Sequence, residues 1–224
     1  MATYAGDISP CAKTNHARLA HASQNLIPKL LQQLLLFYEP TNKIENDCSN
    51  NSYLSDKLNA TERDTICKAN TDGYVNFDVP LIYKLLRNLN LIPPPTRGWG
   101  PQGGPKLTET TIGDDLERFR TSRNEILHRR NTNVSDRELT EYFTQFKGIA
   151  QRLELVLNKK KNELVSEFQN LETCCMDDTS EQVLANLAKK EKEFTLSNEL
   201  SGKVVIINEC YRLIIFTLVT IFIE

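Results

Sequence analysis

The stretch Phe77-Asp78-Val79-Pro80-Leu81-Ile82-Tyr83-Lys84-Leu85-Leu86-Arg87-Asn88-Leu89 indicates the fold class of this chain. Asp78 is a favourable N-cap residue and Pro80 falls in the first turn, so a helix is expected to begin here. The leucines and the isoleucine that follow make this helix short and strongly apolar. A loop must come next, because residues 93–105 hold five of the nine prolines and four of the nine glycines.

Three longer helices are predicted around this segment. From Asn15 to Tyr38 apolar residues recur at spacings of three and four, and Pro40 ends the helix. Acidic residues open a second helix at 114–130, and a capping-box pattern at Ser135 opens a third that runs to about residue 158. No segment before Gly202 alternates as a strand does, so the sequence predicts an all-α helical bundle with a helical C-terminal extension.

Two further expectations concern the core and the segment after the first helix. Residues 41–75 are polar and rich in Asn, and we expect mostly loop there, with one short helix at 61–68. One core is expected to collect apolar residues from several helices: Leu30, Leu34, Leu85, Leu116, Phe119, Phe143 and Phe146.

Composition places the chain among ordinary globular proteins. Of its 224 residues 40% are hydrophobic and 25% are charged, and the formal net charge is −2, so only a local patch could attract nucleic acid. The six cysteines lack the spacing of a zinc site, and we predict no metal and no cofactor. Without a secretory leader, a reducing, cytoplasmic location with free thiols is expected.

The predicted organisation has four parts. Residues 1–14 are a disordered N-terminus, 15–160 a helical domain, 161–202 a charged helical extension and 203–224 an apolar tail. Residues 204–223 leave three readings open: a membrane segment, a truncated strand, or an artefact of the gene prediction. Association with a membrane through this tail is therefore the alternative location.

Two segments in this order carry a resemblance to a known family. One runs from Phe77-Asp78-Val79-Pro80-Leu81 into Pro93-Pro94-Pro95 and Gly98-Trp99, and the other is Arg123-Asn124-Glu125-Ile126-Leu127-His128. Together they resemble HEPN domains, most closely the type found in the DAZ-interacting zinc-finger ubiquitin ligase. The RING of that ligase has no counterpart in this sequence, so ligase activity is not implied.

The resemblance implies candidate site residues on one helix. In many HEPN domains an Arg followed after four to six residues by His forms a metal-independent ribonuclease site shared by two protomers, and Arg123 and His128 match this pattern. His suits removal of the 2′-hydroxyl proton, and Arg suits stabilisation of the phosphate. Asn124, four residues before His128, is placed to orient the imidazole.

The same helix carries a basic patch. Five arginines against the single acid Glu125 give residues 118–130 a local charge of +4, and the four besides Arg123 are candidate RNA-binding residues: Arg118, Arg120, Arg129 and Arg130. Basic residues also gather at helix C-termini for dipole reasons alone, and Arg123 pairing with an acid such as Glu141 is an open alternative.

Two function hypotheses follow. The first is a homodimeric HEPN domain that binds single-stranded RNA and cleaves it with Arg123, Asn124 and His128. The second is a non-enzymatic scaffold that oligomerises and binds other signalling proteins, in an innate-immunity setting that the resemblance implies. The 93–105 loop is expected to be a structural connector, with Trp99 packing it onto the helices.

Overall fold

A computed structural model describes residues 10–100 and 104–174, all of which belong to one compact unit. Within these residues the helix is the only regular secondary structure, which confirms the all-α prediction. None of the described helices is long and apolar enough to cross a membrane. The predicted tail at 203–224, and most of the extension before it, lie outside the described residues.

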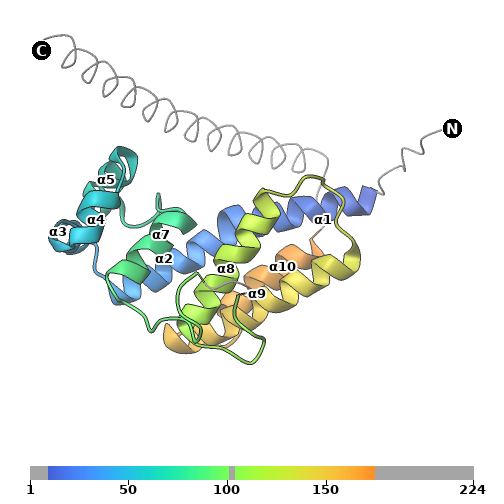
Figure 1. The fold of residues 1–224 in the computed structure, drawn as a ribbon. Coiled ribbons are helices and arrows are strands. Elements are labelled where there is room, and N and C mark those ends of the chain that lie inside the picture. Colours follow the sequence, from blue (N-terminus) through green and yellow to red (C-terminus); the bar gives the residue numbers. More distant parts are fainter. Residues whose placement is uncertain (1–9, 101–103, 175–224) are drawn as a thin grey trace, which may run out of the picture. The chain divides into compact units, whose positions relative to one another are not determined.

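The N-terminal part of the bundle is one helical run (Figure 1). It consists of α1 (Pro10–His21), the π-helical turn η1 (Ala22–Leu26) and α2 (Ile27–Tyr38). The run ends before Pro40 as predicted, but it begins at Pro10, earlier than the expected Asn15. The π turn packs against α8 and α10, so the run lies along the middle of the bundle.

Residues 41–75 correct the sequence prediction. The expectation of mostly loop was wrong, because four short helices form: α3 (Ile44–Asn50), α4 (Ser52–Lys57), α5 (Ala60–Cys67) and α6 (Ala69–Asp72). Only α5 was expected. Helices this short are marginal in isolation, and they persist here because buried side chains such as Ile44 and Leu54 anchor them and Asn51 and Asn59 cap them.

Four longer helices complete the bundle: α7 (Val79–Asn88), α8 (Ile112–Leu127), α9 (Asp136–Val156) and α10 (Glu163–Thr173). The predicted caps are present, since Asp78 accepts from the Leu81 N–H at 2.9 Å and Ser135 accepts from the Glu138 N–H at 3.2 Å. Helix α7 packs on α2, and α8 contacts α7, α1 and α9, as Figure 1 shows.

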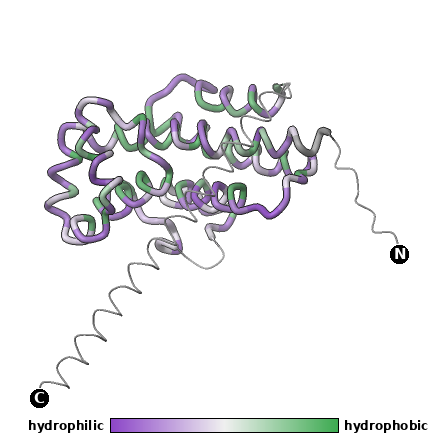
Figure 2. Tube along the Cα trace, turned by 90° about the horizontal axis from the view of Figure 1, so that it is seen from above, coloured by the Kyte–Doolittle hydropathy of each residue, from purple (hydrophilic) through white to green (hydrophobic). Residues whose placement is uncertain are grey.

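One hydrophobic core joins these helices and includes all seven residues predicted for it. Figure 2 shows the apolar stretches of the helices alternating with hydrophilic ones, as amphipathic helices require. Phe146 lies at the centre. Its ring centroid is 5.9 Å from that of Phe119 and 5.8 Å from that of Phe168 on α10. Because Phe168 is buried, the bundle continues past residue 160, into a segment that the sequence assigned to the charged extension.

Candidate functional site

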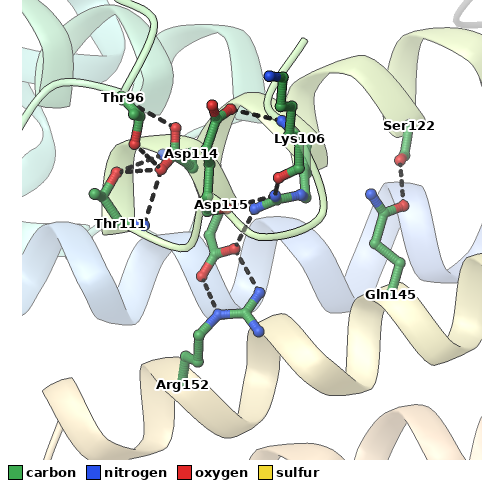
Figure 3. Close-up of polar contacts among 10 residues, drawn as sticks. Thr96, Lys106, Thr111, Asp114, Asp115, Ser122, Gln145 and Arg152 are labelled. Atoms are coloured by element: carbon green, nitrogen blue, oxygen red, sulfur yellow. Dashed lines mark hydrogen bonds and ion pairs between the residues drawn. The ribbon is translucent and has the colours of Figure 1, made fainter.

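Helix α8 carries the Arg-x-x-x-x-His string, and its first turn is fixed to the proline-rich loop. The Thr111 hydroxyl caps the helix, and the Asp114 carboxylate accepts from the Thr111 N–H at 2.9 Å in return. Asp114 also accepts from the Thr96 N–H at 2.8 Å and from the Thr96 hydroxyl at 2.7 Å (Figure 3). Burial alone would raise the pKa of Asp114, but these hydrogen bonds outweigh it and leave the pKa lowered.

Gly113 lets the loop backbone touch α8 directly. A Cβ atom at this position would lie 2.5 Å from the Pro93 carbonyl oxygen and 2.5 Å from the Pro95 nitrogen. Both neighbours are main-chain atoms, which cannot move aside as a flexible side chain can. The loop is therefore a structural connector, as predicted, and any side chain at residue 113 would push it off the helix.

Asp115 joins α8 to α9 inside the bundle. Its buried carboxylate accepts from Arg118 at 3.0 Å. It also accepts from two nitrogens of Arg152 at 2.7 and 2.6 Å, as Figure 3 shows. A second Arg118 nitrogen donates to the Lys106 carbonyl at 2.6 Å, and only 7% of the arginine is exposed. Arg118 thus holds the loop and the helix together, and in this conformation its guanidinium is not accessible to RNA.

Glu117 connects α8 to α7 and to the loop. Its buried carboxylate accepts from the Tyr83 hydroxyl, from the Gly100 N–H at 3.0 Å and from Arg120 at 2.8 Å. Burial would raise the pKa of Glu117, yet these donors lower it overall, so the residue stays ionised. Burial, followed by the interactions with Glu117, raises the pKa of Tyr83 to about 12, which keeps that hydroxyl protonated as a donor.

Trp99 packs the loop onto α7. Its ring meets Tyr83 edge-on with centroids 5.5 Å apart, and the Arg87 guanidinium lies 5.8 Å from the Trp99 ring centroid. The tryptophan is partly buried against the core, which confirms the predicted packing role.

A pocket of about 320 Å³ opens between α4, α7 and α8, next to this network. Among its described lining residues four are cationic and none is acidic; they are Tyr53, Val79, Pro80, Tyr83, Lys84, Arg87, Asn88, Arg120, Arg123 and Asn124. Lys84 is paired with Glu62 at 2.6 Å, and Arg120 with Glu117 at 2.8 Å.

Arg123 and Asn124 from the predicted catalytic set both line this pocket. An Arg123 guanidinium nitrogen donates to the Asn124 side-chain oxygen at 3.3 Å, and both side chains are half-buried. Glu141, the acid considered as a partner for Arg123, is instead paired with Arg137 at 2.9 Å. Asn124 therefore contacts the guanidinium, and its link to residue 128 is the bond from the His128 N–H to the Asn124 carbonyl at 2.9 Å.

His128 lies at the C-terminal end of α8, where it is the C-cap residue and exposed. It does not belong to the pocket lining. It lies five residue positions after Arg123 along the helix, which corresponds to a rotation of about 140° and a rise of about 7.5 Å. Within one chain, the two residues of the string thus face different surroundings.

The remaining predicted RNA-binding residues are distributed around α8. Arg120 lines the pocket, with its guanidinium 5.2 Å from the Tyr83 ring centroid. Arg129 makes an ion pair with Glu138 and donates to the Asn133 carbonyl at 2.9 Å, whereas Arg130 is exposed. The structure therefore gathers Arg120, Arg123 and Asn124 and leaves the other predicted residues outside the pocket.

The α7 side of the pocket was absent from the sequence prediction. Lys84, Arg87 and Asn88 are spaced by three and four residues, so they form one polar stripe on a helix whose apolar stripe was recognised. That polar stripe is a signal in the sequence, but nothing local indicates that it faces α8.

Comparison with known proteins identifies one family. The sequence model of the family described as DZIP3/ hRUL138-like HEPN matches residues 28–184. Neither the curated proteins nor the solved structures yield a match to the chain.

Proposed function

On the premise that this chain belongs to the DZIP3/ hRUL138-like HEPN family, we propose that it binds single-stranded RNA at the basic pocket between α7 and α8. The observation that carries this proposal is the set of four cations around a pocket that has no acid among its described lining residues. Phosphate contacts from Lys and Arg provide most of the affinity of proteins for nucleic acids. Arginine adds bidentate hydrogen bonds to phosphate oxygens.

Arg87 is the cation best placed to recruit a phosphate. Its side chain is exposed at the pocket and no carboxylate among the described residues pairs with it, while the Trp99 ring supports the guanidinium. Lys84 and Arg120 already have acidic partners and contribute a weaker field. The pocket volume is about 320 Å³, and we propose that it receives one nucleotide of a single strand.

The proposed chemistry is cleavage of the bound RNA without a metal. His128 would take the proton from a 2′-hydroxyl, and the resulting oxygen would attack the adjacent phosphorus. The bond from phosphorus to the 5′-oxygen would break, the 5′-oxygen would take a proton from water, and a 2′,3′-cyclic phosphate would remain. Arg123 would stabilise the charge on the phosphate. Because His128 lies outside the pocket of its own chain, we place the Arg123 of one protomer opposite the His128 of another, in a homodimer.

Binding is tested by fluorescence anisotropy with a labelled single-stranded RNA. Arg87→Ala and Arg123→Ala should each weaken binding and reduce the slope of log K against log salt by about 0.7 per lost phosphate contact. Arg137→Ala is the matched control, since it removes the same charge from an exposed site on α9 outside the pocket. Equal RNA affinities for all three variants would refute RNA binding at the pocket.

Cleavage is tested separately, in EDTA, by identifying the 2′,3′-cyclic phosphate product. His128→Ala should lose about 10²- to 10⁴-fold in rate while binding RNA almost as before. The rate per chain should fall on dilution if the site is shared by two protomers. A substrate with deoxyribose at the cut site should resist cleavage.

The alternative function is that of a non-enzymatic scaffold. If the parent protein neither binds nor cuts RNA, the non-enzymatic scaffold that associates with signalling proteins becomes the preferred function. In either case we propose that the protein acts in immune-type signalling, as the family resemblance implies.

A further inference from the structure

Tyr53 is an aromatic residue with no role in the core. It is 52% exposed, and it lines the basic pocket on the wall formed by α4. Single exposed tyrosines are common on protein surfaces, so exposure alone assigns no function. Its place in the lining of a pocket that also contains three arginines distinguishes it.

The backbone that carries Tyr53 is held firmly. The Asn51 side-chain oxygen caps α4 by accepting from the Leu54 N–H at 3.0 Å, and the Asn51 amide donates to the Asn88 carbonyl at 2.9 Å on α7. Leu54, the residue after Tyr53, is completely buried. One asparagine therefore ties α4 to the helix that supplies Lys84 and Arg87, and Tyr53 projects from a fixed position.

The pocket lining combines two kinds of side chain. The lining residues Arg87, Arg120 and Arg123 on α7 and α8 are cationic, whereas Tyr53, Val79 and Pro80 supply aromatic and aliphatic surface. A nucleotide has the same division, with a charged phosphate at one end and a flat apolar base at the other. Proteins that bind single strands combine such a cationic groove with aromatic rings on which bases stack.

We infer that Tyr53 stacks on a base of the bound RNA while the pocket arginines hold its phosphate. This inference deepens the proposed RNA-binding function and rests on it. Stacking uses the face of the base, so it tolerates all four bases. The pocket should therefore require a base at this position and discriminate little among base types.

The experiment is a cycle of two proteins and two RNAs with the full 224-residue chain. Affinity is measured for the parent and for Tyr53→Ala, each with an ordinary single-stranded RNA and with an abasic RNA of equal length and charge. Tyr53→Ala should weaken binding of the ordinary RNA by about 5- to 150-fold and leave binding of the abasic RNA unchanged. Tyr53→Phe should bind as the parent does, because it keeps the aromatic ring.

Phe37→Ala is the matched control, since Phe37 is 49% exposed on α2 and does not line the pocket. Thermal unfolding of Tyr53→Ala should nearly match that of the parent, because about half of this residue is exposed and it does not belong to the core. Fluorescence of Trp99, the only tryptophan, gives a second signal for RNA binding through its contact with Arg87.

The outcomes separate the two proposals. If Arg87→Ala weakens binding but Tyr53→Ala does not, or if Tyr53→Ala weakens both RNAs equally, RNA binding stands and the stacking role is overturned. If the parent protein binds neither RNA, the proposed function fails and the stacking role fails with it.

Discussion

Replacing Asp115 with Asn should destabilise the bundle far more than the loss of one surface charge would. Asn has the same shape as Asp, so the change leaves no cavity. It removes the anion that both Arg118 and Arg152 contact, at distances from 2.6 to 3.0 Å. Arg118 is 7% exposed and cannot turn to solvent without giving up its bond to the Lys106 carbonyl.

Breaking a buried ion pair by removing one partner costs about 3–5 kcal/mol, because the remaining charge is left buried without compensation. For a domain of this size each kcal/mol lowers the melting temperature by about 2–4 °C. The expected decrease for Asp115→Asn is therefore about 6–20 °C. Circular dichroism at 222 nm during heating measures it directly.

Glu141→Gln is the matched control. It also removes one carboxylate from an ion pair with arginine, but the Glu141 and Arg137 side chains are 63% and 89% exposed. Water screens such a pair, so the melting temperature should shift by less than about 2 °C. If Asp115→Asn lowered the melting temperature as little as Glu141→Gln, the buried network would not hold α8 to α9.

Three further predictions concern α8 and the core. Gly113→Ala should lower the melting temperature, because its Cβ would lie 2.5 Å from main-chain atoms of the loop. Gly148→Ala should instead stabilise α9 by up to about 1 kcal/mol, because the nearest neighbour of its Cβ is the Arg152 side chain at 3.7 Å. The reverse order of melting temperatures would contradict the contact between the loop and α8. Phe143→Ala should cost about 3–5 kcal/mol in urea unfolding, since Phe143 is completely buried, and a loss below about 1 kcal/mol would place it outside the core. The folded-state pKa of Glu117 is lowered from 4.5, so Glu117 contributes stability that is complete above about pH 4.5 and is lost as the pH falls through the folded pKa. Glu117→Gln should therefore make the free energy of unfolding less dependent on pH in that range. An acid unfolding profile identical to that of the parent would contradict this role of Glu117.

The longer helices were predictable because their signals are local. Asp78 and Ser135 cap α7 and α9 where the sequence indicated, and the repeated apolar spacing identified the core residues. The start of α8 was displaced by two residues, because Thr111 is the cap and Asp114 completes the capping box from inside the helix. Both arrangements satisfy the same preference for acidic residues in the first turn.

Of the short helices, only α5 was predicted, and α3, α4 and α6 were not predictable in the same way. Each holds only one or two buried side chains, too few to show a period, and their stability comes from contacts with distant parts of the chain. The part of the pocket formed by α4 and α7 likewise depends on contacts between distant parts of the chain. Asn51 and Asn88 are 37 residues apart, and their hydrogen bond brings Tyr53 to the pocket.

The roles of the α8 arginines could be predicted only in part from the sequence. The sequence showed five arginines near Glu125, but not which of them the fold uses. Asp115 and the Lys106 carbonyl engage Arg118, and Glu138 engages Arg129, whereas Arg120 and Arg123 reach the pocket. Distinguishing structural from accessible arginines required the three-dimensional positions of their partners.

Photo-crosslinking followed by peptide mass spectrometry locates the RNA most directly. Single-stranded RNA carrying 4-thiouridine is irradiated with the full chain, and the attached peptides are sequenced. Crosslinks should fall on Tyr53, on residues 84–88 of α7 and on residues 120–124 of α8, and Arg87→Ala should reduce them. Crosslinks confined to the lysines at 159–161 after α9, with the α7 and α8 peptides unmodified, would contradict the account.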